Sequence, residues 1–102
     1  MKVKNLNGSG ALFPQPTCDC ENWIEHWIHN KGVKPIYCRC CGKRTTDLVG
    51  GHIIKVNSND KNRYIVPLCR DCNNSNNTRE FDVYESDLVS ANCDYCKNKK
   101  AH

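Results

Sequence analysis

Two Cys-x-x-Cys pairs constrain this chain more than any other feature of its sequence. Cys38 and Cys41 form the first pair, Cys69 and Cys72 form the second, and a run of strand-forming residues separates them. Close cysteine pairs at such a separation are typical of a zinc ion held by four thiolates. We therefore expect one structural Zn²⁺ at these cysteines, and we expect the fold to be organised around it.

The composition favours stabilisation by metal over stabilisation by disulfides. The 102 residues suffice for one domain, but the hydrophobic fraction of 38% includes nine cysteines, which leaves a thin core. The first ten residues lack the apolar segment of a signal peptide, and no apolar run approaches membrane-spanning length. We expect a cytoplasmic protein in a reducing compartment, without membrane contact, whose cysteines bind Zn²⁺ as thiolates.

The remaining cysteines predict a second zinc site. Four of them lie in two further close pairs: Cys18, Cys20, Cys93 and Cys96. Cys40 lies inside the first pair and is interpreted as a spare thiol. Two alternatives stay open: His26 or His29 is a zinc ligand beside Cys18 and Cys20, or the chain binds a single zinc ion and keeps several free thiols.

The local composition predicts a flexible arm over residues 1–17, and we expect a single α+β domain over residues 18–102. The arm is polar and rich in Gly, Asn and Pro. An amphipathic helix follows, with Asp19 as its N-cap and Gly32 as its C-cap. Its apolar residues recur at helical spacing: Trp23, Ile24, Trp27 and Ile28.

The segment between and after the cysteine pairs predicts a hairpin followed by a helix. Residues 48–56 and 63–68 are strand-like and are joined by a wide polar loop. The second cysteine pair is expected to open a helix that runs to about Arg79. Residues 81–84 and 88–89 are expected to form one or two short closing strands.

The stretch from Tyr37 to about Arg79 resembles the zinc-containing HNH endonucleases, which have a treble-clef or ββα-metal core. The resemblance rests on the ordered motifs G-H-I, Y-I-V-P-L-C and C-x-x-C-N. It implies a zinc-stabilised treble-clef domain in which His52 is the general base that activates water. It also implies that Asn73 and Asn77, four residues apart on one face of a helix, hold a catalytic Mg²⁺.

Two positions depart from the pattern of that family. Gly51 stands where an acid or histidine often holds the catalytic ion, and Tyr64 stands where an asparagine is often found. Neutral amides alone hold a hard divalent ion weakly. We therefore expect a zinc-binding HNH-like module that is catalytically weak or inactive and binds nucleic acid or a protein partner. The alternative is a metal-dependent endonuclease with His52 as general base.

The net charge does not by itself predict a partner. The formal charge is +4, but each zinc ion with its four thiolates adds about −2. The positions of the bases carry more information, and a DNA- or RNA-binding surface would be formed by Arg39, Lys43, Arg44, Lys55, Lys61, Arg63, Arg70 and Arg79. Tyr84 and Tyr95 favour a protein partner instead, and in both cases we expect a monomer.

Overall fold

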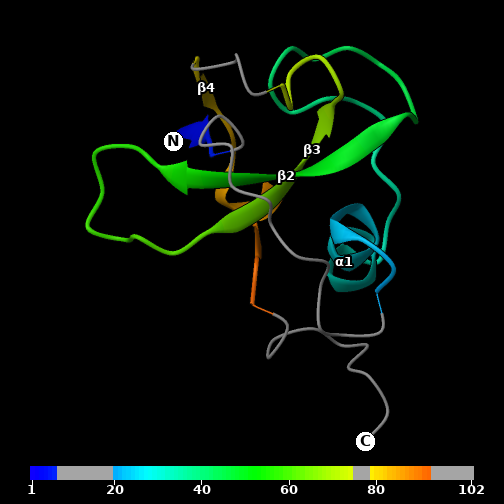
Figure 1. The fold of residues 1–102 in the computed structure, drawn as a ribbon, viewed down its shortest axis with the longest axis horizontal. Coiled ribbons are helices and arrows are strands. Elements are labelled where there is room, and N and C mark those ends of the chain that lie inside the picture. The colour runs from blue at the N-terminus through cyan, green and yellow to red at the C-terminus, as the bar shows by residue number, and fades with distance from the viewer. Residues whose placement is uncertain (7–19, 75–78, 93–102) are drawn as a thin grey trace, which may run out of the picture.

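A computed structural model describes residues 1–6, 20–74 and 79–92 of the chain (Figure 1). In chain order, the described elements are β1 (Lys2–Asn5), α1 (Trp23–Lys31), β2 (Leu48–Lys55), β3 (Tyr64–Cys69), β4 (Glu80–Asp82), the short 3₁₀ helix η2 (Glu85–Asp87) and β5 (Val89–Ser90). The strands form one sheet against which α1 packs, so the predicted α+β class is confirmed.

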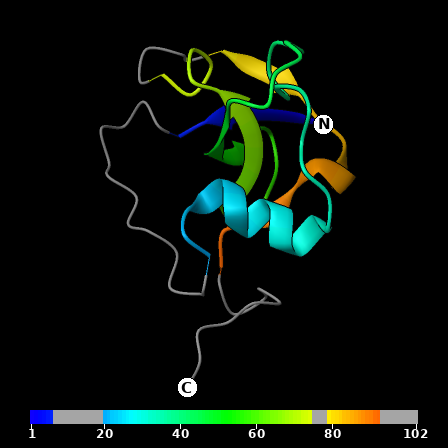
Figure 2. The ribbon, with the colours of Figure 1, turned by 90° about the vertical axis from the view of Figure 1, so that its right-hand side faces the viewer.

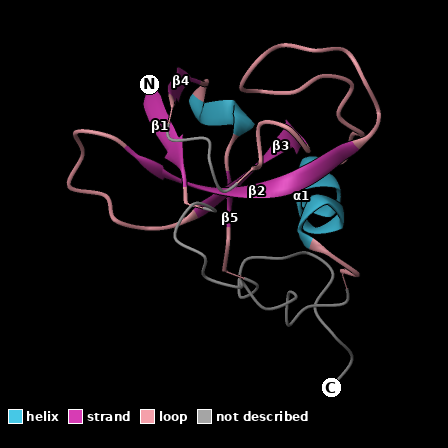
Figure 3. Ribbon diagram, turned by 45° about the horizontal axis from the view of Figure 1, so that its top comes forward, coloured by secondary structure: helices cyan, strands magenta, loops and turns pink. Residues whose placement is uncertain are grey.

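The sheet has the strand order β4-β1-β2-β3-β5, and each neighbouring pair is antiparallel (Figure 3). At its centre, β2 and β3 form the predicted hairpin with its wide loop. The register pairs Leu48 with Cys69 and His52 with Ile65. Because successive residues of a strand point to opposite faces, this register also fixes which side chains of the hairpin share a face.

The strand β1 corrects the predicted N-terminal arm. Lys2–Asn5 pairs with β2 on one side and with β4 on the other, and Val3 is completely buried. The prediction of a flexible segment is therefore wrong for these residues. Two ladders of backbone hydrogen bonds and the burial of Val3 outweigh the polar local sequence. Residues 7–17 of the predicted arm lie outside the described residues.

The helix α1 covers one face of the sheet (Figure 2). Gly32 is its C-cap, as predicted, at a φ of 75°. The N-cap is Asn22 rather than Asp19, and its side-chain oxygen accepts a hydrogen bond of 2.9 Å from the backbone N–H of Glu25. Asparagine is a preferred N-cap and stands directly before the first helical residue. No helix in the described part of the chain is long and apolar enough to cross a membrane.

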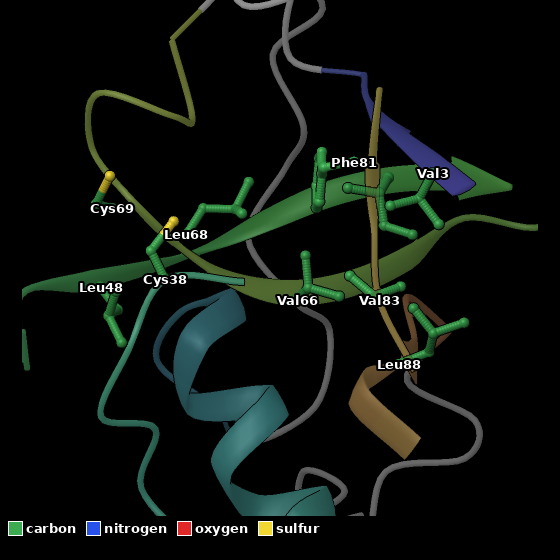
Figure 4. Packing of buried hydrophobic residues seen from close by; sticks show 10 residues of the cluster. Val3, Cys38, Leu48, Val66, Leu68, Cys69, Phe81, Val83 and Leu88 are labelled. Carbon is green, nitrogen blue, oxygen red and sulfur yellow. The ribbon is translucent and has the colours of Figure 1, made fainter. Parts of the chain in front are cut away.

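Hydrophobic side chains pack on both faces of the sheet. Ile65 and Val66 are neighbours along β3 and therefore point to opposite faces. On the face covered by α1, Ile65 packs with Trp27 and Val89. The larger cluster (Figure 4) includes Val66, and its buried members are Val3, Cys38, Leu48, Ile53, Val66, Leu68, Cys69, Phe81, Val83 and Leu88.

Close packing on β2 explains why two glycines stand in the middle of this strand. A Cβ atom on Gly50 would lie 2.6 Å from the carbonyl carbon of Trp23 in α1. On the opposite face, a Cβ atom on Gly51 would overlap the side chain of Leu68 and lie 3.1 Å from Asn73 Oδ1. The glycines allow α1 and the loop of the second cysteine pair to approach the strand directly.

The helix predicted after the second cysteine pair is absent from the described residues. Residues 70–73 form a turn, closed by a hydrogen bond of 3.0 Å from the Asn73 N–H to the Cys69 carbonyl, and β4 begins at Glu80. The sequence there is rich in asparagine, whose side chain competes for backbone hydrogen bonds and disfavours helix. The helix of a ββα core is therefore not found in residues 70–74 and 79–92, and residues 75–78 lie outside the described chain.

Candidate metal centre

The two Cys-x-x-Cys pairs converge at one end of the central hairpin. The sulfur atoms of Cys38, Cys41, Cys69 and Cys72 all lie within 4.8 Å of one another, as the sequence predicts. The first pair lies on the connection between α1 and β2, Cys69 ends β3, and Cys72 lies in the turn that follows. Because Leu48 at the start of β2 pairs with Cys69 at the end of β3, the cysteine pair that precedes β2 lies beside the pair that follows β3.

Tight backbone turns orient the thiols of Cys38 and Cys41. The Cys38 N–H donates to the Lys43 carbonyl over 2.9 Å, and the Gly42 N–H donates to the Cys38 carbonyl over 2.9 Å. Gly42 has a φ of 79°, a left-handed conformation that glycine adopts without strain. The Cys40 N–H lies 3.4 Å from Cys38 Sγ, a contact that orients a metal-binding thiolate.

The geometry of the sulfur atoms fits a zinc ion. Cys41 Sγ and Cys69 Sγ lie 3.8 Å apart. A tetrahedral ion with Zn–S distances of about 2.3 Å separates its sulfur ligands by about 3.8 Å. Four thiolates favour zinc over hard ions such as Mg²⁺, and a closed set of four leaves no position for a reacting water. A metal ion held by these four cysteines would therefore be structural rather than catalytic.

Electrostatics favour a cation at this cluster of cysteines. Burial disfavours the Cys38 thiolate, but hydrogen bonds from the backbone of Cys41, Cys69 and Cys40 outweigh burial and lower its pKa to about 7. Burial raises the pKa of Cys69 and of Cys72, and the thiol groups of neighbouring cysteines add to this increase. One cysteine therefore ionises readily, and its negative charge disfavours ionisation of the others. A divalent cation removes this repulsion, so metal uptake should release protons.

Segments distant in the sequence hold the two pairs in place. The Arg39 N–H donates to the Pro67 carbonyl over 3.0 Å and so joins the first pair to β3. Asn5 Nδ2 donates to the Cys72 carbonyl over 3.0 Å and so joins the second pair to β1. Sequence analysis missed Asn5, because its role depends on the pairing of β1 and no local pattern marks it.

Of the four cysteines in the second predicted zinc site, the structure describes only Cys20. Cys18, Cys93 and Cys96 lie outside the described residues. Cys20 is 4% exposed, and its sulfur lies 3.1 Å from His29 Nδ1. His26 is instead fully buried, and its Nε2–H donates to the Ser90 carbonyl over 2.8 Å. Burial lowers the pKa of His26. Of the two candidate histidines, the structure therefore places His29 beside a cysteine.

His52 lies beneath α1 rather than at an accessible site. It is 6% exposed, and its ring packs edge-on against Trp23 with 4.8 Å between the ring centroids. Burial, together with the positive charges of Arg63 and His26, lowers its pKa to about 4. An effective general base has a pKa near the working pH. In this environment His52 is a weak proton acceptor and contributes to packing.

The low pKa of His52 predicts a loss of stability in mild acid. The unfolded chain takes up this proton near pH 6.5, whereas the folded chain takes it up near pH 4. The unfolded state therefore binds more protons as the pH falls. The stabilisation is complete above pH 6.5 and is lost progressively toward pH 4, to a total of roughly 3 kcal/mol.

Urea denaturation measures this effect against a variant that cannot titrate at position 52. With zinc in excess, the free energy of unfolding of the wild type should fall more steeply with decreasing pH than that of His52→Gln. Protonation of the cysteines affects both proteins equally, so the difference between the two profiles isolates His52. Parallel profiles would contradict the assignment.

Of the residues predicted to form a catalytic site, the two that the structure describes, His52 and Asn73, are not brought together. Gly51 and His52 are neighbours along β2 and point to opposite faces. Asn73 lies on the Gly51 side, whereas His52 lies beneath α1. The side chain of Asn73 is also engaged, because its Oδ1 accepts a hydrogen bond of 3.4 Å from Asn5 Nδ2. Asn77 lies outside the described residues.

Tyr64 supports the hairpin loop. Its hydroxyl donates a hydrogen bond to Asp60 Oδ2, and the same carboxylate pairs with Lys55 Nζ at 3.1 Å. The hydrogen bond from Tyr64, with others from the Asn62 backbone and Lys55, lowers the pKa of Asp60 to about 2. This cluster closes the wide loop between β2 and β3.

The predicted basic surface is smaller than the sequence indicates. Arg39 is largely buried and is not part of the exposed surface, because its Nε pairs with Asp87 Oδ1 at 2.9 Å and its side chain is 11% exposed. Lys55 is likewise engaged with Asp60 and Glu85. The other six predicted bases are exposed: Lys43, Arg44, Lys61, Arg63, Arg70 and Arg79.

Comparison with known proteins assigns no family to the chain. The cysteine centre is defined by its own geometry, in which four sulfur atoms can hold one metal ion. No protein-family model, curated protein or solved structure matches the sequence or the fold.

Proposed function

We propose that this chain is a zinc-stabilised, HNH-like module that binds nucleic acid and has no hydrolytic centre among the residues that the structure describes. One observation supports the lack of a hydrolytic centre: His52 and Asn73 lie on opposite faces of β2. A hydrolytic site requires a base and a metal ion that act on the same water molecule. Two side chains separated by a sheet do not meet this requirement.

The relation to the HNH fold is supported by the order of the zinc-binding elements. A cysteine pair, a hairpin with a histidine and a second cysteine pair follow one another, and the two pairs meet at the base of the hairpin. Gly51 argues against a rearranged ion site at the position of the missing acid. Any side chain there would overlap Leu68, so an acid could not be accommodated without displacing the core.

Exposed bases beside the zinc centre support nucleic acid as the ligand. Lys43 and Arg44 follow the first cysteine pair, and Arg70 lies between the cysteines of the second. Arg70 Nε lies 3.3 Å from Asp47 Oδ1, but both side chains are about 70% exposed. Such an exposed ion pair is weak, so a phosphate can replace the carboxylate. A metal-fixed backbone would hold these bases in constant positions along a phosphate chain.

A plasmid experiment tests the absence of hydrolysis. The purified protein, incubated with supercoiled plasmid and Mg²⁺, Mn²⁺ or Ni²⁺, is expected to leave the plasmid intact. A trace of nicking, if detected, should be the same in His52→Ala, because the buried imidazole does not activate water. Robust Mg²⁺-dependent nicking that His52→Ala abolishes would establish the endonuclease instead.

Binding is tested in the same samples by fluorescence anisotropy with a labelled duplex. The affinity should fall steeply with salt, because contacts to phosphate release condensed counterions. Lys43→Gln with Arg44→Gln should weaken binding and reduce the dependence on salt. Lys2→Gln is the matched control, since Lys2 pairs with Asp82 at 2.8 Å on the far strands of the sheet. Affinity that is unchanged by the double substitution would refute this surface.

A protein partner is the second candidate, and one observation favours it. Tyr84 is 77% exposed and, with Met1 and Tyr37, lines a shallow hollow on the surface. An exposed tyrosine beside a hollow is typical of an interface anchor. If a protein is the ligand, Tyr84→Ala should abolish binding, whereas the substitutions at Lys43 and Arg44 should have little effect. Tyr95, the other predicted aromatic contact, lies outside the described residues.

A further inference from the structure

A hollow with aromatic walls opens on the surface where the segment before the first cysteine pair meets the connection from β4 to η2. It has a volume of about 330 Å³, near the lower end of the range for small-ligand sites. Tyr37 and Tyr84 line it and are 37% and 77% exposed. With Met1, they make up three of the five exposed large hydrophobic residues in the described chain. Such a concentration marks a binding surface.

Neighbouring groups hold the ring of Tyr37 and the backbone of Tyr84 in place. The guanidinium of Arg39 lies 3.9 Å from the ring centroid of Tyr37 and covers one face of that ring. The Tyr84 N–H donates to Asp87 Oδ2 over 2.8 Å, and the Asp87 N–H donates to the Tyr84 carbonyl over 2.9 Å. A ligand therefore meets walls that are largely preformed, which reduces the entropy lost on binding.

The charged groups of the hollow favour an uncharged ligand over a phosphate. Asp82 and Asp87 both line it, and their carboxylates would repel a phosphate group. The guanidinium of Arg39 is engaged, because its Nε pairs with Asp87 Oδ1 at 2.9 Å and its Nη1 donates to the Tyr37 carbonyl over 2.9 Å. An uncharged planar group such as a nucleobase suits these surroundings, since the face of any base can stack on an aromatic ring.

Bases that can hold phosphates lie beside the hollow rather than inside it. Tyr37 and Arg44 pair in an antiparallel bridge. Directly opposite residues of such a pair have Cβ atoms about 5 Å apart and side chains on the same face. Arg44 is exposed, and the exposed Lys43 precedes it. A base in the hollow and phosphates on Arg44 and Lys43 can therefore belong to one strand.

We propose that this hollow receives an unpaired base of a single-stranded nucleic acid, which stacks on Tyr84 while Arg44 and Lys43 hold the adjoining phosphates. The inference rests on the proposed function and names the class of nucleic acid that the chain binds. The bases of a duplex are paired and stacked on one another, whereas an unpaired base can turn its face to an aromatic side chain. Aromatic rings beside a row of bases are the common elements of sites for single strands.

Fluorescence anisotropy with the zinc-bound full chain tests the class of nucleic acid. A labelled single strand should bind more tightly than a duplex of the same length at the same salt concentration. Tyr84→Leu should weaken the binding of the single strand about tenfold, as expected for the loss of one stacked base, and leave the affinity for the duplex unchanged. Tyr84→Phe keeps the ring and should retain the affinity. Val33→Ser is the matched control, because Val33 is 60% exposed and lies outside the lining of the hollow.

A fluorescent aminopurine base within the single strand reports stacking independently of affinity. Its emission should be quenched when the strand is saturated with wild type or with Tyr84→Phe, and much less with Tyr84→Leu. Equal affinity for the two kinds of strand, or a Tyr84→Leu variant that binds and quenches like the wild type, would overturn the inference. The proposed function would still stand if Lys43→Gln with Arg44→Gln weakened binding. A wild type that binds neither strand would overturn both and favour a protein partner.

Discussion

Removal of zinc at neutral pH is expected to unfold this protein. A structural zinc site contributes on the order of 10 kcal/mol to folding, which is comparable with the entire stability of a typical domain. The reason in this chain is that two of the candidate metal ligands are also core residues. Cys38 is completely buried and Cys69 is 6% exposed, and both belong to the larger hydrophobic cluster. The repulsion between thiolates that follows metal loss would act inside that cluster.

Far-ultraviolet circular dichroism during titration with a strong chelator measures the expected unfolding. Cys69→Ser should be severely destabilised and should lose the first zinc ion. Cys40→Ser is the matched control, because Cys40 is only half-buried and lies outside the set of four clustered sulfur atoms. It should cost little and leave the zinc content unchanged. A native spectrum after verified metal removal would show that packing alone holds the fold.

The cysteine pairs and the hairpin between them could be predicted because both are local patterns. The spacing within a Cys-x-x-Cys pair fixes the relative placement of two thiolates, and alternating β-branched residues mark the strands. The same holds for the C-cap at Gly32, where a glycine follows the last helical residue. These features require no knowledge of segments distant in the sequence.

The features that sequence analysis missed depend on contacts between distant segments. β1 becomes a strand only because β2 and β4 pair with it. Gly51 reads as a missing metal ligand in the sequence, yet it is required by the approach of Leu68 and Asn73. The burial of His52 depends on the packing of α1 across β2, which periodicity within either element does not reveal.

The burial of Arg39 is also a long-range feature that sequence analysis missed. From the sequence, Arg39 was predicted to be one base of an exposed patch. In the structure, its guanidinium lies 3.9 Å from the ring centroid of Tyr37 and 5.5 Å from that of Trp27. Its Nη1 also donates to the Tyr37 carbonyl over 2.9 Å. The residue therefore links the first cysteine pair to α1 and to η2.

Substitution of Asp87 by alanine is expected to destabilise the protein by about 3 to 5 kcal/mol, because it leaves the charge of Arg39 buried without a partner. The two side chains of this ion pair are 11% and 12% exposed. Asp87 also accepts a hydrogen bond of 2.8 Å from the Tyr84 N–H and so closes η2. Urea denaturation at neutral pH with zinc in excess measures the loss.

A double substitution separates the value of the ion pair from the cost of leaving one charge alone. Arg39→Met combined with Asp87→Leu removes both charges and keeps side chains of similar volume. Because a buried ion pair is often no more stable than packed hydrophobic residues, the double variant should recover much of the stability lost in Asp87→Ala. Lys2→Gln provides the exposed comparison, since the pair of Lys2 with Asp82 is more than half exposed and should contribute at most about 1 kcal/mol. A loss in Asp87→Ala no larger than that in Lys2→Gln would mean that water reaches Arg39 in solution, and the link from the zinc centre to α1 would then rest on packing alone.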